Sequence, residues 1–179
     1  RALGDVYRSQ HSRDSAPGKV VALVGPSGWG KSTVGHLVER FYEAEGSAGT
    51  RIWLDGLPLD GLDPHWVRRQ VGLVDQSPAL FDMTVRENIR VGLMPNNIRQ
   101  LVFGATDRAQ EERFAESVGF NLRHLDRSAA ELSMGDLRKL EFARTLATGA
   151  KTLLLDEIVA GLTTGEIAMI ADLIKQLRR

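Results

Sequence analysis

A glycine-rich stretch near the N-terminus has the composition of a phosphate-binding loop. Residues 25–32 read GPSGWGKS, which matches the pattern of a glycine, four residues, and then Gly-Lys-Ser/Thr. In such a loop the glycines let backbone N–H groups converge on phosphate oxygens, and the start of the following helix adds partial positive charge. Lys31 can then reach the β- and γ-phosphates, and the Ser32 hydroxyl can bind Mg²⁺. The apolar run before the loop and the helical pattern after it favour this interpretation over a chance glycine turn.

The predicted phosphate contacts extend over the whole loop and one residue beyond it. Trp29 is unusual, because that position more often holds a small residue, and we expect it to be tolerated while changing how the loop packs. The predicted set is Gly25, Pro26, Ser27, Gly28, Trp29, Gly30, Lys31, Ser32 and Thr33.

Two acidic residues follow another apolar run, in the sequence LLLDE at 153–157. The carboxyl end of a buried strand in an open α/β sheet is where ligands bind. We therefore expect Asp156 to hold Mg²⁺, directly or through water, and Glu157 to orient or deprotonate an attacking water. The alternative is that both acids are solvated or cap a helix, and the phosphate loop upstream makes this the weaker interpretation.

Buried strands alternating with helices must position these groups. Continuous apolar runs predict strands that are buried on both faces at 20–24, 71–75 and 151–157. Helices are predicted at 31–42, from Asp63-Pro64 onward, over most of 84–130, at 136–148 and at 164–178. This alternation predicts an α/β fold with a parallel sheet, in which the helix-rich block forms an inserted subdomain.

Composition narrows the class of protein further. The chain has 179 residues, with 23 Lys and Arg against 23 Asp and Glu, so its formal net charge is zero. Without a basic excess, nucleic-acid binding by bulk electrostatics is disfavoured. The absence of cysteine excludes disulfides, thiolate metal sites and a Cys nucleophile. The apolar runs are far shorter than the ~20 residues of a membrane-spanning helix, so we expect any membrane role to come through a partner or a further part of the chain.

Three further segments resemble motifs of the ATP-binding cassette (ABC) ATPases. Residues 71–89 resemble the Q-loop region of that family, with Gln76 as the loop glutamine. Residues 132–147, which begin LSMGD, resemble the signature motif and its following helix, and 153–162 resemble the Walker B strand and D-loop. The order and approximate spacing match the family, and 41–89 is most similar to exporter-type nucleotide-binding domains.

The resemblance implies a fold and a domain organisation. The fold is that of a P-loop NTPase, an α/β parallel sheet with an inserted helical subdomain. Residues 1–179 are expected to form a single nucleotide-binding domain. Its RecA-like core is expected at about 20–83 and 149–179, and its helical subdomain, with the signature motif, at about 84–148.

The resemblance also implies how ATP is bound. In this family two such domains pair head to tail, with ATP between the phosphate loop of one and the signature motif of the other. Ser133 and Gly135 would contact the partner's ATP, and Gln76 would sense metal and nucleotide and relay the state to a membrane domain. The implied catalytic residues are Glu157, Lys31 and Gln76, and the implied Mg²⁺ ligands are Ser32, Gln76 and Asp156. Tyr7 would either stack on adenine or serve packing alone.

Several residues depart from the family pattern. Met134 replaces a glycine of the signature motif and adds bulk, and Asp136 replaces a glutamine and places negative charge near a phosphate. Both changes are expected to weaken the partner's site more than this chain's own. Thr163 stands where the D-loop has aspartate, and Ile158 replaces the proline after the catalytic glutamate, which we expect to be tolerated.

The family's switch histidine, which follows one more strand, has no counterpart here. All four histidines precede the Walker B segment, at His11, His36, His65 and His124. We expect that the chain is a fragment of a longer protein, the alternative being that something else completes the sheet. His36 and His65 are expected to be surface or packing residues.

Three functions remain open at this point. The favoured one is an ATP-hydrolysing domain of an exporter, using ATP and Mg²⁺ at the cytoplasmic face of a membrane, with a second nucleotide-binding domain and a transmembrane domain as partners and no nucleic acid. The second is a regulatory or degenerate cassette module that binds ATP with little hydrolysis. The third is an ABC protein of DNA repair or translation, which the neutral charge and the lack of coiled-coil heptads disfavour.

Overall fold

The computed structural model describes residues 18–26, 28, 30–42, 52–75, 79–94 and 107–177. The chain forms two compact units, an N-terminal unit (Arg1–Val71, with Arg178–Arg179) and a C-terminal unit (Gly72–Leu177). The division into a core and a helical subdomain that the resemblance implies stays a prediction.

Short helices and one hairpin make up the described part of the N-terminal unit. Its elements are α2 (Lys31–Val38), β1 (Trp53–Leu54), β2 (Leu57–Pro58), the 3-10 turn η1 (Leu59–Gly61) and α3 (Pro64–Gln70). β1 and β2 pair antiparallel around Asp55 and Gly56, whose φ values of 50° and 79° suit a two-residue Asp-Gly turn. α3 begins as predicted, because the Asp63 carboxylate accepts a hydrogen bond from the Trp66 N–H at 2.8 Å.

The strand predicted at 20–24 is wrong, since this segment has no strand structure and is exposed. Val24, for example, is 87% exposed. An apolar run is buried as a strand only where neighbouring strands pair with its backbone and other elements cover its faces. In the described part of the N-terminal unit, β1 and β2 pair with each other and not with 20–24. The run therefore lacks, within this unit, the neighbours that a strand needs.

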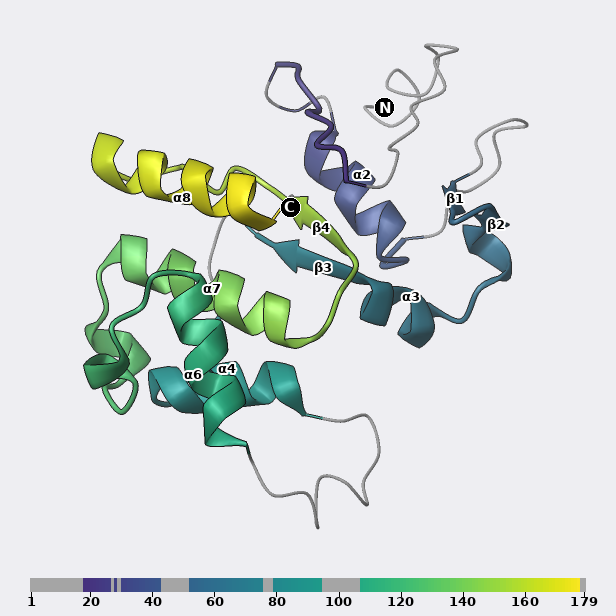
Figure 1. The fold of residues 1–179 in the computed structure, drawn as a ribbon. Coiled ribbons are helices and arrows are strands. Elements are labelled where there is room, and N and C mark those ends of the chain that lie inside the picture. The colour runs from purple at the N-terminus through teal and green to yellow at the C-terminus, as the bar shows by residue number, and fades with distance from the viewer. Residues whose placement is uncertain are drawn as a thin grey trace. The chain divides into compact units, whose positions relative to one another are not determined.

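A parallel pair of strands and a group of helices build the C-terminal unit (Figure 1). β3 starts at the last residue of the N-terminal unit and lies beside β4, and both strands run in the same direction, as predicted. The Asp156 N–H donates to the Val74 carbonyl at 3.0 Å, so pairing continues past the end of β4. The elements are β3 (Val71–Val74), α4 (Val85–Leu93), α6 (Arg108–Ser117), η2 (Leu122–His124), η3 (Ala129–Glu131), α7 (Met134–Ala147), β4 (Thr152–Leu155) and α8 (Thr164–Leu177).

The core of the C-terminal unit lies where α4, α6 and α7 pack together (Figure 1). α4 approaches α7 closely at Gly92, where an added Cβ would collide with the backbone carbonyl of Arg144. α8 joins the same core through Ile170 and Leu173. Fully buried members of the core include Val74, Val85, Ile89, Ala115, Leu125, Leu140, Phe142 and Ala143.

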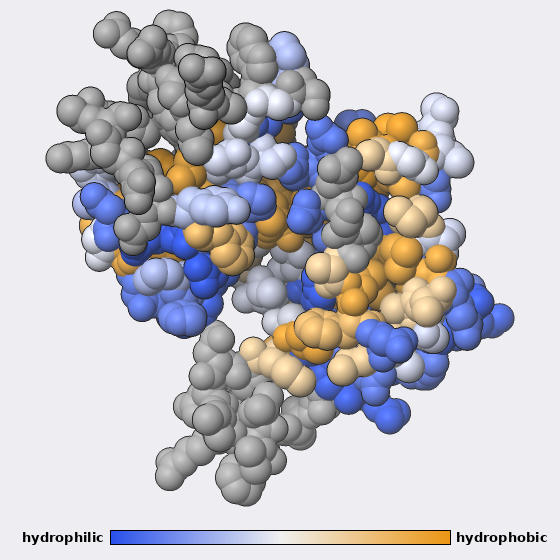
Figure 2. All heavy atoms as spheres, turned by 180° about the vertical axis from the view of Figure 1, so that it is seen from behind, coloured by the Kyte–Doolittle hydropathy of each residue, from blue (hydrophilic) through white to orange (hydrophobic). Residues whose placement is uncertain are grey.

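Large apolar side chains are exposed on both units, and Figure 2 shows apolar side chains gathered in patches among hydrophilic ones. Among the described helices, none combines the length and the apolar character that crossing a bilayer demands.

Candidate nucleotide-binding site

The phosphate loop leads into α2 in the N-terminal unit. Gly28 and Gly30 have φ values of 81° and 79°, a left-handed conformation that glycine adopts at little cost. Gly30 is the N-cap of α2, and no side-chain hydrogen bond caps the helix there. The first N–H groups of α2 are thus suited to an anion. The Lys31 ammonium donates to the carbonyl oxygens of Gly25 and Pro26, each at 3.0 Å, so it lies over its own loop.

The predicted acidic residues follow β4 in the C-terminal unit. Asp156 is half-buried, and Glu157 is exposed with a φ of 43°. A left-handed conformation costs a residue with a Cβ on the order of 1 kcal/mol, and such strain is concentrated at functional sites. Among the described residues, no three His, Cys, Asp or Glu side chains form a metal-binding group. The predicted Mg²⁺ ligands are a hydroxyl, an amide and one carboxylate. The lack of three clustered His, Cys, Asp or Glu side chains in the described part of the chain therefore does not test them.

The helix predicted at 136–148 is α7, and it begins two residues earlier, at Met134, with Ser133 as its N-cap. The Ser133 hydroxyl accepts a hydrogen bond from the Asp136 N–H at 3.2 Å and caps the helix. Met134 is 46% exposed and Gly135 is buried. The Asp136 carboxylate pairs with the Lys139 ammonium at 3.0 Å, which partly balances the negative charge that was expected to oppose a phosphate.

Glu166 lies against the start of α7, a contact that the sequence analysis missed. Its Oε2 accepts hydrogen bonds from the N–H and the hydroxyl of Thr163, each at 2.8 Å, in a capping box for α8. Its Oε1 lies where a Cβ on Gly135 would be. Hydrogen bonds from Thr163 lower the pKa of Glu166, and the nearby Gly135 backbone lowers it further. The Thr-x-x-Glu spacing at 163–166 was the signal available in the sequence.

Some predicted site residues lie outside the described residues. They are Tyr7, Ser27, Trp29 and Gln76, and their roles stay predictions. His36, by contrast, packs its ring edge-on to that of Phe41, with 6.1 Å between the centroids, as a packing role requires.

A family model described as ABC transporter matches residues 9–160. The chain belongs to the ABC transporter family. The match includes the phosphate loop, LSMGD and the acids after β4, so the resemblance drawn from these motifs is confirmed.

Curated ABC relatives include "Multidrug resistance protein pgp-1" of Caenorhabditis elegans, 38% identical over 165 residues, which cover 90% of this chain and 12% of that protein. "Antigen peptide transporter 2" of Rattus norvegicus is 36% identical over 146 residues, covering 82% of this chain and 20% of its own length. This chain therefore spans less than a quarter of the relatives' length.

A solved "bacterial Atm1-family ABC exporter with ATP bound" has the same fold, with a TM-score of 0.73 and 29% identity. The match covers 92% of this chain and 28% of the exporter. A second solved structure, "cbiO1 from clostridium perfringens", gives a TM-score of 0.74 at 26% identity, over 90% of this chain and 63% of that one. The predicted P-loop NTPase fold is thus confirmed, and the chain corresponds to the ATP-binding domain of exporter-type ABC transporters.

In this ABC domain, the signature helix also holds the backbone next to the predicted Q-loop. The Arg138 guanidinium donates to the Asp75 carbonyl, and the Asp75 N–H donates to Glu141 Oε1 at 3.3 Å. Arg138 and Glu141 form a buried ion pair at 3.0 Å. Burial raises the pKa of Glu141, and its hydrogen bonds to Asp75 and Arg138 only partly oppose that shift. Sequence reasoning missed both side chains, because one helix face looked like an ordinary charged surface.

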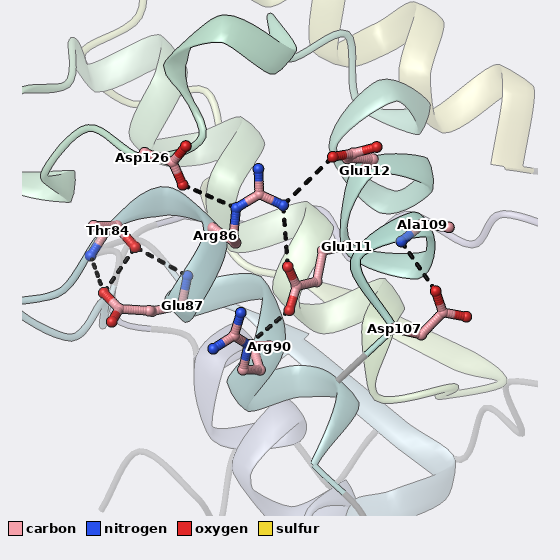
Figure 3. Close-up of polar contacts among 9 residues, drawn as sticks. All are labelled: Thr84, Arg86, Glu87, Arg90, Asp107, Ala109, Glu111, Glu112 and Asp126. Carbon is pink, nitrogen blue, oxygen red and sulfur yellow. Dashed lines mark hydrogen bonds and ion pairs between the residues drawn. The ribbon is translucent and has the colours of Figure 1, made fainter. Parts of the chain in front are cut away.

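A second buried charge ties α4 to α6 (Figure 3). Glu111 is fully buried and accepts hydrogen bonds from Arg90 at 2.6 Å and from Arg86 at 3.2 Å. Arg86 also pairs with Asp126 at 2.9 Å and with Glu112 at 3.6 Å. The hydrogen bond to Asp126 is the main cause that raises the pKa of Arg86. This network holds the helices next to the signature helix in place.

Proposed function

We propose that this chain hydrolyses ATP and powers export when it is paired with a second nucleotide-binding domain. The observation that carries the proposal is the loop of the N-terminal unit. There, left-handed Gly28 and Gly30 lead into an α2 helix without a side-chain cap, and Lys31 lies over the loop. This geometry suits a polyphosphate, with backbone N–H groups and one ammonium in place of a broad basic surface.

Each predicted residue then has a role in binding or hydrolysing ATP. Lys31 binds the β- and γ-phosphates and stabilises the charge that develops on them during transfer. Glu157 orients the attacking water and accepts its proton. Gln76 contacts the metal and the nucleotide. Gly25, Pro26, Ser27, Gly28, Trp29, Gly30, Ser32 and Thr33 surround the phosphates, and Tyr7 is a further contact, to adenine.

The residues assigned to Mg²⁺ suit that ion. Ser32, Gln76 and Asp156 offer hydroxyl, amide and carboxylate oxygens, the hard ligands that Mg²⁺ takes together with phosphate oxygens and water. When bound, Mg²⁺ neutralises charge on the β- and γ-phosphates. Asp156 is half-buried at the end of a paired strand, so its carboxylate is held by the fold and not by a flexible tail.

The proposed partners follow from how ATP is enclosed. Ser133 and Gly135, at the start of α7, would contact ATP bound to the phosphate loop of a second, head-to-tail domain. A transmembrane domain at the membrane would convert the closing of the pair into movement of a substrate across it. Under this proposal the chain works at the cytoplasmic face, where ATP is present.

The test measures nucleotide binding and phosphate release on the same samples. Lys31→Met is expected to lower phosphate release at least about 100-fold, the typical effect of removing one group that stabilises developing charge. Glu157→Gln should retain Mg²⁺-dependent binding of mant-ATP and lower phosphate release about 10²- to 10⁴-fold. Lys175→Met is the matched control, because Lys175 is an exposed lysine paired with Asp172 on α8 and should leave both measurements unchanged. Unchanged phosphate release in Glu157→Gln would contradict the assignment.

The second candidate, an ATP-binding module with little turnover, is favoured by the start of α7. Two carboxylates, those of Asp136 and Glu166, lie at the helix end that is proposed to meet a phosphate. Under this alternative the unmodified chain binds Mg·ATP but releases no phosphate above the rate of Glu157→Gln.

A further inference from the structure

The side chain of Glu166, in the first turn of α8, contacts the start of the signature helix α7. Its two carboxylate oxygens lie in different places: Oε2 accepts from Thr163 at 2.8 Å, and Oε1 lies against the Gly135 backbone, where a Cβ would be. Gly135 is buried under this contact, and a Cβ there would collide with the Glu166 side chain unless that side chain moved. Glu166 therefore fills the space immediately above the Gly135 backbone.

We propose that Glu166 is an autoinhibitory latch, which occupies the space against the Gly135 backbone at the signature helix until a partner-bound triphosphate displaces it. This proposal rests on the proposed function, in which Ser133 and Gly135 contact the partner's ATP. A carboxylate oxygen and a phosphate oxygen cannot both lie in that space. A carboxylate that stays in place also repels the incoming phosphate, and the Asp136 side chain adds to that repulsion.

The latch can open without unfolding α8. Its carboxylate is exposed on the side of Thr163, and Thr163–Glu166 is a local capping box at the first turn of the helix. A change of side-chain rotamer would release Gly135 while Oε2 or water continues to serve the Thr163 N–H. Displacing Glu166 costs free energy whenever the start of α7 binds a partner's ATP. Glu166 therefore lowers the affinity of this signature motif for the partner's nucleotide.

The Glu166→Gln variant tests the latch contact with Gly135 separately from the capping box with Thr163. A capping box accepts either Glu or Gln at this position. The amide, however, has a single acceptor oxygen and no charge, so a glutamine that caps Thr163 presents no anionic oxygen to Gly135. Glu87 provides the matched control, because it forms the same kind of capping box with Thr84 at the start of α4.

The experiment compares the 179-residue chain with Glu166→Gln, Glu166→Ala and Glu87→Gln by sedimentation velocity, with Mg²⁺ and a non-hydrolysable ATP analogue. Both Glu166 variants should self-associate more tightly in the presence of nucleotide, by about tenfold, which lies within the usual range of coupling between sites. Glu87→Gln should match the parent chain. Equal or weaker association of Glu166→Gln would overturn the latch and indicate that Glu166 supports the signature helix instead.

Two further readouts keep the outcomes distinct. Binding of mant-ATP reports on the phosphate loop alone, so loss of binding in every protein would refute the proposed function and the latch with it. Normal mant-ATP binding with unchanged association refutes the latch alone. In ¹⁵N-labelled protein, the Gly135 amide resonance should shift between the parent and Glu166→Gln without nucleotide, and an unshifted resonance would show that the contact is absent.

Discussion

The Arg138 side chain donates a hydrogen bond to the backbone carbonyl of Asp75, the residue immediately before Gln76. Arg138 lies on the helix that begins with the signature motif, and Asp75 directly follows β3. Two motifs that are more than fifty positions apart in the sequence are therefore joined by one buried side chain. A movement of the signature helix has a direct physical route to the segment that contains Gln76.

Removing Arg138 is expected to destabilise the fold strongly. Arg138→Met leaves Glu141 charged and buried without its ion-pair partner, which typically costs about 3–5 kcal/mol. The free energy of unfolding in urea measures the effect. Arg127→Met is the control, because its pair with Glu131 is exposed and such pairs contribute about 0–1 kcal/mol. A second variant, Arg138→Met with Glu141→Leu, should recover part of the loss, and an equal loss in both Arg138 variants would contradict this reasoning.

Stability should depend on pH through Glu141. Burial raises its pKa above 4.5, so the folded state binds a proton more tightly than the unfolded state. The unfolding free energy of the parent, relative to Glu141→Gln, should therefore rise as the pH falls through the raised pKa toward 4.5. Urea titrations of both proteins between neutral pH and that value provide the measurement.

Glu87 should give a pH dependence of the opposite sign. Hydrogen bonds from Thr84 lower the pKa of Glu87 below 4.5, so its carboxylate stabilises the fold at neutral pH and above 4.5. That contribution is lost as the pH falls through the lowered pKa. The stability difference between the parent and Glu87→Gln should thus shrink below pH 4.5, and a constant difference would count against the capping box.

The Glu111 carboxylate should be the main electrostatic support of α4 and α6. Glu111→Gln removes a fully buried charge from two guanidinium groups, and we expect a loss of about 3 kcal/mol, the lower end of the range because both arginines remain partly exposed. Glu112→Gln, in which an exposed carboxylate 3.6 Å from Arg86 is removed, should cost less than about 1 kcal/mol. Similar melting temperatures for the two variants would disprove this ranking.

Gly92 should tolerate no larger residue, since α4 and α7 touch there. The added methyl of Gly92→Ala would collide with the Arg144 carbonyl, and overpacking of this kind costs about 1–3 kcal/mol. Gly165→Ala is the matched control, because nothing lies within 4 Å of a Cβ at that position in the first turn of α8. Alanine should stabilise the helix there by up to about 1 kcal/mol. Thermal unfolding of both variants distinguishes the two environments.

Local signals in the sequence predicted most of the elements. Asp63-Pro64 starts its helix as expected, because the capping carboxylate lies within three residues of the N–H group that it accepts from. α7 begins two residues before its predicted start at 136, with Ser133 as its cap. β3 and β4 also lie close to the predicted ranges, since each is an apolar run that is paired in the structure. The phosphate loop was identifiable for a similar reason, because its chemistry depends on residue types at fixed short spacing.

Features that depend on distant neighbours were not predicted. The run at 20–24 has the composition of a strand, but in its own unit no described strand pairs with it. The buried charges of Glu111 and Arg138 were not among the predicted residues, since burial depends on helices that meet only in the folded chain. The contact of Glu166 with Gly135 likewise joins two helix starts about thirty residues apart, and no local pattern encodes that meeting.

The backbone at Glu157 would suit glycine better than glutamate, because its φ of 43° disfavours any residue with a Cβ. Glu157→Gly should therefore relax the turn after β4 and raise the melting temperature while removing the carboxylate that the proposed hydrolysis needs. At this position the backbone conformation favours glycine, whereas the proposed hydrolysis needs a carboxylate. Under the role proposed for Glu157, a substitution that raises the melting temperature at this position therefore lowers the rate of phosphate release.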